Sequence, residues 1–154
     1  GESITEGKLK IGSAMQTMVI RELLKSLPPN TDILLFDAPP GTSCPVVETI
    51  SDADFILLVT EPTPFGLHDL KLAVEMVRAL RLPFAVVINR ADVGDKAVDD
   101  YCKAQNVPII MRIPFERRIA ESYSRGGMLL EAVPELKDKF LEVYEFASGK
   151  AVTQ

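Results

Sequence analysis

The chain has 154 residues and a formal net charge of −5, with 47% hydrophobic and 25% charged residues. This length and balance fit one soluble domain, residues 1–154. The acidic charge and the lack of a basic stripe argue against nucleic-acid binding. The longest apolar runs fall far short of the roughly 20 residues that cross a bilayer. Because the chain opens with no export signal, we expect a cytoplasmic protein without a membrane span.

The predicted elements alternate between helices and strands. The strands are short runs of Ile, Val, Leu and Phe without a two-residue period, as in strands buried on both faces. The helices show apolar residues at helical spacing. In chain order we predict helix 13–27, strand 32–36, helix 45–50, strand 55–60, helix 67–80, strand 84–88, helix 95–105, strand 107–113, helix 116–123 and helix 135–146.

Two of these helices have clear apolar faces. The faces are Leu70, Val74, Val77 and Leu80 in helix 67–80, and Leu136, Phe140, Val143 and Tyr144 in helix 135–146. We expect both faces to pack inward. The polar face of the last helix mixes lysines with acidic residues, whereas a membrane-surface helix would be rich in Lys and Arg there.

Alternating strands and helices predict an α/β fold, a parallel sheet with helices on both faces. Function in such a sheet lies at the carboxyl ends of the strands. Polar and turn-forming segments follow each apolar run at these ends: Asp37–Gly41, Glu61–Pro64, Asn89–Asp92 and Pro114–Glu116.

Asp37 ends an apolar run and is followed by Ala-Pro-Pro-Gly41. A carboxylate at a strand end holds magnesium directly or through water, and magnesium takes only one or two carboxylates. Gly41 leaves a backbone amide open to a terminal phosphate, and Pro39 and Pro40 stiffen the loop. A strand end with an ordinary turn is the alternative. The Pro-Pro-Gly sequence favours a site, with Asp37 as the metal ligand.

Asn89 and Arg90 follow the strand 84–88. An asparagine side chain pairs a donor and an acceptor with an adenine edge, and a guanidinium stacks on a flat ring. Taken alone, however, an asparagine at this place is more often a turn residue.

Several segments resemble the MinD/ParA/Mrp ATPases in family order. Asp37-Ala-Pro-Pro-Gly-Thr42 resembles their switch motif, and Cys44-Pro-Val46 resembles the subgroup with an inserted ferredoxin domain. The other similar segments are Lys10–Gly12, Leu58–Thr63, Gly66–Leu70, Val87–Asp92 and Arg112–Glu116. The resemblance covers essentially the whole chain and implies a SIMIBI-type P-loop NTPase fold.

The resemblance also implies roles for individual residues. Asn89 and Arg90 would line an adenine pocket, and the loop with Pro114 and Glu116 would close over the base through backbone contacts. An ordinary helix start also accounts for Pro114 and Glu116, and both can hold together. The loop 60–69 would face a dimer partner and the nucleotide. His68, the only histidine, has no recognisable triad context, so we expect it to be structural or exposed.

The sequence contains no GxxxxGK[ST] motif and no GG-x-GK variant. In the resembled proteins this phosphate-binding loop precedes the position of Gly1, and its strand lies between those ending at Asp37 and Thr60. We therefore expect a gap in the sheet, or direct pairing of these two strands. Because hydrolysis needs the loop and its lysine, we predict no catalytic residue here and an inactive isolated chain.

The two cysteines, Cys44 and Cys102, are too few for an iron–sulfur cluster or an all-cysteine zinc site. Any cluster of a longer parent protein would be held outside this chain. Cys44 is either a thiol that communicates with such a cluster or a buried residue at a helix start, and burial is the commoner fate of free cysteine. We expect Cys102 to pack against the sheet.

Two functions remain open. The first is the ATP-binding part of a MinD/Mrp-like ATPase, which in complete form binds ATP or ADP with Mg²⁺, forms a homodimer through its switch loops and serves an iron–sulfur or redox client protein. The second is a non-enzymatic α/β interaction module that has lost nucleotide binding. A receiver-like domain is less favoured, because Asp37 lacks an acidic pair in the right place.

Overall fold

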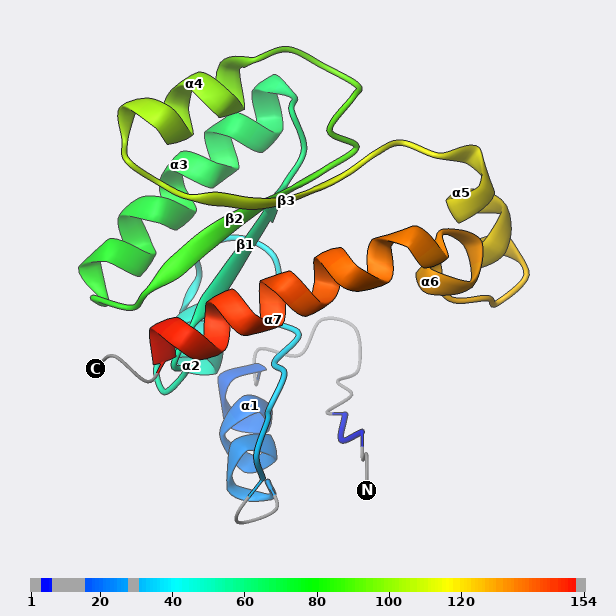
Figure 1. Ribbon diagram of the computed structural model, residues 1–154. Coiled ribbons are helices and arrows are strands. Elements are labelled where there is room, and N and C mark those ends of the chain that lie inside the picture. The colour runs from blue at the N-terminus through cyan, green and yellow to red at the C-terminus, as the bar shows by residue number, and fades with distance from the viewer. Residues whose placement is uncertain (1–3, 7–15, 28–30, 152–154) are drawn as a thin grey trace. The chain divides into compact units, whose positions relative to one another are not determined.

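The computed structural model describes residues 4–6, 16–27 and 31–151. The chain divides into two compact units, residues 1–53 and residues 54–154 (Figure 1). The segment Lys10–Gly12 and the first residues of the predicted helix 13–27 lie outside the described residues. That residues 1–154 form one domain stays a prediction.

The first unit contains helices α1 (Gln16–Lys25) and α2 (Cys44–Ile50). Both were predicted, and Pro45 occupies the first turn of α2, where its missing N–H costs no hydrogen bond. Arg21 of α1 donates two hydrogen bonds to the Glu48 carboxylate of α2, at 2.6 and 3.1 Å. These bonds raise the pKa of Arg21 and lower the pKa of Glu48.

The predicted strand 32–36 is wrong. Residues 33–39 carry no helix or strand assignment, and Ile33, Leu34 and Leu35 are all exposed, Leu35 at 92%. An extended segment becomes a strand only where a neighbouring strand pairs with its N–H and C=O groups. The sheet of the described residues contains no strand from this segment. The apolar run alone therefore overstated the local structure.

The second unit is built on a three-stranded sheet of β1 (Ile56–Thr60), β2 (Phe84–Asn89) and β3 (Ile109–Ile113). All pairs are parallel, in the order β1-β2-β3. This confirms the three later strands and the parallel α/β class. Because parallel strands share one direction, the chain leaves all three at the same edge.

Helices connect and flank the strands of this unit. They are α3 (Pro64–Ala79), α4 (Ala97–Ala104), α5 (Arg117–Ser124), α6 (Leu129–Ala132), the 3₁₀ turn η1 (Pro134–Leu136) and α7 (Lys137–Ala151). Helices at α3, α4, α5 and α7 were predicted, whereas α6 was not, and the single helix predicted at 135–146 is divided into η1 and α7. Among the described residues, no helix is long and apolar enough to span a membrane.

The sheet is covered on both faces, as predicted. Figure 1 shows α3 and α4 on one side of the strands and α7 crossing the other side. Seven buried residues form the first core: Leu70, Val74, Val86, Ile88, Val98, Cys102 and Val107. Five form the second: Val87, Met111, Val133, Leu136 and Val143. Neighbouring β2 residues therefore enter opposite cores, which fixes the strand register.

The apolar face predicted for the last helix is only half correct. Leu136 and Val143 are buried, whereas Phe140 and Tyr144 are 38% and 48% exposed. A helix lying on a sheet buries a narrow stripe, and these two side chains lie on its flank. In α3 the prediction holds for Leu70, Val74 and Val77.

Candidate functional site

The candidate site lies where the three strands of the second unit end. β1 leads into Glu61, β2 ends at Asn89 and leads into Arg90, and β3 leads into Pro114 and Phe115. A hydrogen bond from the Ala91 N–H to the Ile113 carbonyl, at 2.9 Å, joins the segments after β2 and β3. The sheet thus brings together segments that are far apart in the sequence.

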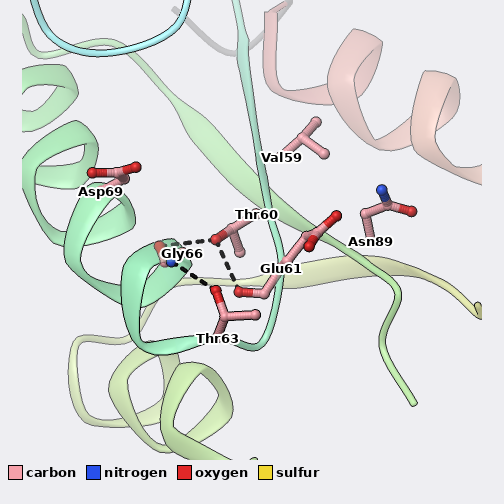
Figure 2. Close-up of a pocket in the computed structure, with 7 residues that line it drawn as sticks. All are labelled: Val59, Thr60, Glu61, Thr63, Gly66, Asp69 and Asn89. Atoms are coloured by element: carbon pink, nitrogen blue, oxygen red, sulfur yellow. Dashed lines mark hydrogen bonds between the residues drawn. The ribbon is translucent and has the colours of Figure 1, made fainter. Parts of the chain in front are cut away.

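A hollow of about 350 Å³ opens at this edge, between the end of β1 and the first turns of α3. Its lining residues are Val59, Thr60, Glu61, Thr63, Gly66, Asp69 and Asn89. Figure 2 shows the Glu61 side chain extending toward the side of the hollow where Asn89 lies. With two carboxylates and an amide, the hollow suits hydrogen-bond donors of a ligand better than phosphate.

The start of α3 is held tightly against the end of β1. The Thr63 hydroxyl caps the helix by accepting a hydrogen bond from the Gly66 N–H at 3.0 Å, and the Thr60 hydroxyl donates to the Gly66 carbonyl at 3.0 Å (Figure 2). A Cβ on Gly66 would lie 2.2 Å from the Glu61 carbonyl oxygen. Only glycine therefore permits this close approach.

Arg90, the residue after Asn89, has an unusual backbone conformation. Its φ of 52° is in the left-handed region, which non-glycine residues seldom adopt. The guanidinium lies over the Phe115 ring, with Cζ 4.7 Å from the ring centroid. Its Nη1 is 3.6 Å from a Glu61 carboxylate oxygen. The left-handed turn thus directs Arg90 toward groups from both neighbouring strand ends.

The loop after β3 is tied in two directions. The Phe115 N–H donates a hydrogen bond to the Asp92 carboxylate, with 2.6 Å between N and Oδ1. Glu116 is the residue before α5, but its side chain does not cap the helix. Instead it pairs with Arg118, which also pairs with Glu135, and these bonds raise the pKa of Arg118.

Pro114 and Glu116 are half-buried and precede α5 rather than lying in its first turn. The expected helix start is therefore shifted by one residue from the predicted boundary. Asn89 is also half-buried, and Arg90 is exposed. The structure brings Asn89 to the hollow and Arg90 to the Phe115 ring; the nucleotide contacts of all four residues stay predictions.

Asp37, Pro40 and Gly41 belong to the first unit and are exposed. Gly41 has φ of 93°, and a Cβ there would meet no atom within 4 Å. Glycine is thus required by the backbone conformation of this loop, not by crowding. Within the described residues no group of three or more Asp, Glu, His or Cys side chains converges on a metal position. That Asp37 holds magnesium stays a prediction.

The two cysteines differ in environment. Cys44 is the first residue of α2 and is exposed, so the expectation that it is buried is wrong. Cys102 is 1% exposed and packs between α4 and the sheet, as predicted, and burial raises the pKa of its thiol. His68 is exposed on α3.

A family model described as ParA, NUBPL iron-transfer P-loop NTPase, matches residues 8–147. The chain belongs to this family. This confirms the predicted resemblance to the MinD/ParA/Mrp ATPases.

Curated relatives point the same way. The chain is 34% identical to an uncharacterized protein of Methanocaldococcus jannaschii, over 81% of this chain and 44% of that protein. It is 27% identical to an iron-sulfur cluster carrier protein of the same organism, over 77% of this chain and 48% of the carrier. It is 26% identical to a cytosolic Fe-S cluster assembly factor NUBP1 homolog of Caenorhabditis elegans, over 90% of this chain and 52% of that protein. The chain spans about half the length of these relatives.

Solved structures share the fold. The ATP complex of Cyanothece McdA(D38A) superposes with a TM-score of 0.64 at 24% identity, over 88% of this chain and 58% of that one. The MinD cell division protein of Aquifex aeolicus superposes with a TM-score of 0.56 at 23% identity, over 73% of this chain and 50% of that one. These likenesses establish the α/β fold of P-loop NTPases.

Sequence reasoning did not assign roles to Glu61, Asp92 and Phe115 in arranging Arg90. Each of them lies one to three residues beyond the end of a strand. Their common position was visible in the sequence, but the pairing of one strand end with another depends on the order of strands in the sheet.

Proposed function

We propose that this chain supplies the base-binding and magnesium-switch segments of a MinD/Mrp-type ATPase that serves iron–sulfur or redox-protein maturation. The single observation that carries the proposal is the arrangement of Asn89 and Arg90 at the carboxyl edge of a parallel sheet. Ligands of open α/β sheets bind at this edge. Family membership and relatives named as iron-sulfur cluster carriers support the cellular role.

In this proposal Asn89 pairs with the edge of adenine and Arg90 stacks on the ring. The loop with Pro114 and Glu116 closes over the base with backbone groups. Asn89 lines the hollow, and the loop after β3 carries Phe115, whose ring lies under the Arg90 guanidinium; all of these residues belong to the second unit. The base-binding part of the site thus needs no residue from the first unit.

The loop of Asp37, Pro40 and Gly41 would respond to the terminal phosphate. Asp37 would hold Mg²⁺ through water, and the Gly41 amide would approach the phosphate oxygens. Bound magnesium would neutralise phosphate charge. The complete protein would bind ATP or ADP, form a homodimer through these switch loops and act on its client in the cytoplasm.

The proposal predicts weak base binding by this chain alone. Titration of ¹⁵N-labelled chain with ADP, followed by NMR, should shift the amide signals of Asn89, Arg90 and Phe115. The variant Asn89→Ala should lose most of this response, whereas Asn106→Ala, a change at the opposite edge of the sheet, should keep it. An absence of shifts at these residues up to millimolar ADP would favour an interaction module without nucleotide binding.

A further inference from the structure

Arg90 combines a left-handed backbone with a ring contact and an ion pair from its side chain. Its left-handed backbone conformation is strained for a residue other than glycine and persists only where the surroundings impose it. The side chain is still 44% exposed. Its guanidinium has two flat faces and a polar edge, and one face lies on the Phe115 ring while the edge faces Glu61.

The backbone at Glu61 and Pro62 is packed closely from two directions. Gly66 approaches the Glu61 carbonyl so closely that a Cβ would lie 2.2 Å away. Gly94 approaches the next carbonyl, that of Pro62, so that a Cβ would lie 1.9 Å away. Each contact excludes a side chain. The segment Glu61–Pro62 is therefore clamped between the start of α3 and the loop that begins at Arg90.

Phe115 is anchored independently. Its N–H bond to Asp92 ties the ring-bearing residue to the same loop that carries Arg90. The Val93 N–H in turn donates to the Arg90 carbonyl at 2.9 Å, which closes the turn. Hydrogen bonds thus tie the backbones of Phe115 and Arg90 to the same loop.

Resting on the proposed function, we propose that Glu61, Asp92 and Phe115 are positioning residues that hold the Arg90 guanidinium as a preformed stacking platform for the nucleobase. Phe115 covers one face, Glu61 fixes the rotation of the edge, and the other face receives the base. A planar guanidinium stacks on flat rings, and ordering it in advance lowers the entropy lost on binding. Glu61 therefore acts on affinity through Arg90, without touching phosphate.

An ordinary exposed ion pair is the competing explanation, and such pairs contribute little to stability. The two explanations differ in what Glu61→Gln changes. Glutamine keeps the size of the side chain but loses the charge that orients Arg90. An ordinary ion pair would leave nucleotide affinity unchanged, whereas a positioning residue would lower it.

The first measurement needs no nucleotide. In ¹⁵N NMR spectra of this chain, the Arg90 Nε–H proton signal should be shifted upfield by the ring current of Phe115, over which the guanidinium lies. Glu61→Gln and Phe115→Leu should each reduce this shift. The matched controls Glu121→Gln, in an exposed helical ion pair with Arg117, and Phe140→Leu, on the flank of α7, should leave it unchanged. An Arg90 signal that is insensitive to Glu61→Gln would overturn the proposal.

The second measurement compares ATP with inorganic tripolyphosphate in the full gene product that contains this sequence. Glu61→Gln should weaken ATP binding about three- to fivefold, the size expected for losing one exposed charge pair. Tripolyphosphate, which has no base, should bind wild type and variant equally. Equal ATP affinities would reject the positioning role of Glu61. Loss of both ligands would also reject it, because the effect would then be structural. Wild-type protein that binds no ATP would instead reject the proposed function.

Discussion

The Asp92 carboxylate accepts a hydrogen bond from the backbone N–H of Phe115, with 2.6 Å between Oδ1 and N. This bond joins the loops that follow β2 and β3, 23 residues apart in the chain. A charged acceptor makes such a bond stronger than one between neutral groups. The loops after β2 and β3 are therefore held together at the carboxyl edge of the sheet.

Asp92→Ala should release the loop after β3. We expect a loss of about 1 kcal/mol in unfolding free energy, because the bond is exposed to water. Hydrogen exchange of the Phe115 amide should become faster while exchange in β2 stays slow. Asp100→Ala, an exposed aspartate in α4, serves as the control. Equal Phe115 exchange in Asp92→Ala and wild type would show that the bond does not hold the loop.

Gly66→Ala should destabilise the protein, although alanine usually stabilises a helix relative to glycine. The added Cβ would collide with the Glu61 carbonyl oxygen, and such overpacking costs about 1–3 kcal/mol. Gly149→Ala in α7, where a Cβ meets nothing within 4 Å, is a matched control and should be neutral or slightly stabilising. Denaturant unfolding measures both. A stable Gly66→Ala variant would contradict the close approach of α3 to β1.

Arg81→Gly should stabilise the protein by about 0.5 kcal/mol. Arg81 follows α3 with φ of 59°, and relief of left-handed strain exceeds the extra chain entropy of glycine. Arg125 follows α5 with φ of −104°, so Arg125→Gly should bring no gain. Thermal unfolding of the two variants checks the difference. A lower melting temperature for Arg81→Gly would show that the arginine side chain makes contacts that outweigh the strain.

The two thiols should react at very different rates. Cys44 is exposed and should react with a thiol reagent in the folded protein, whereas Cys102 should react only after unfolding.

Burial raises the pKa of the Cys102 thiol above its ordinary value of 9.0. The stability that comes from burying the neutral Cys102 thiol is therefore complete below pH 9.0. It is lost as the pH rises toward the pKa of this thiol in the folded protein. Cys102→Ala should remove this alkaline loss, whereas Cys44→Ala should retain it. Rapid labelling of both thiols at neutral pH would contradict the buried position.

The isolated chain should hydrolyse no ATP. It contains no glycine-rich phosphate loop with its lysine, and the remaining groups assist only after that loop binds the phosphates. Phosphate release by the chain should match that of its Asp37→Ala variant. Turnover clearly above this control would require a phosphate-binding group that the motifs do not reveal.

Much of the second unit follows from the sequence. The runs containing Val86 and Met111 are apolar on both sides, which is typical of strands between two helical layers, and the structure confirms them. The similar run at Ile33–Leu35 failed because a strand also requires a paired neighbour. An apolar pattern indicates that a segment can be buried. It does not show whether another strand lies beside that segment and pairs with it.

The location of the candidate site could be predicted from the sequence. Asn89 is the last residue of a buried strand, and its place at the end of an apolar run predicted that it lies at the edge where ligands of open α/β sheets bind. The contacts of Arg90 with Glu61 and Phe115 were not predictable, because they require the order β1-β2-β3 and a left-handed turn at Arg90. Neither has a local signal in the sequence, since an arginine with positive φ is held by its surroundings.

The most direct test of the central claim is isothermal titration calorimetry of the full gene product with ATP, with and without Mg²⁺. The proposal predicts saturable binding of one ATP per chain that magnesium strengthens. Asp37→Ala should lose the magnesium dependence while keeping base-dependent binding, and Asn89→Ala should lose affinity for ATP but not for tripolyphosphate. An absence of binding, or binding that neither variant alters, would contradict the assignment of this chain as the base-binding and magnesium-switch part of an ATPase.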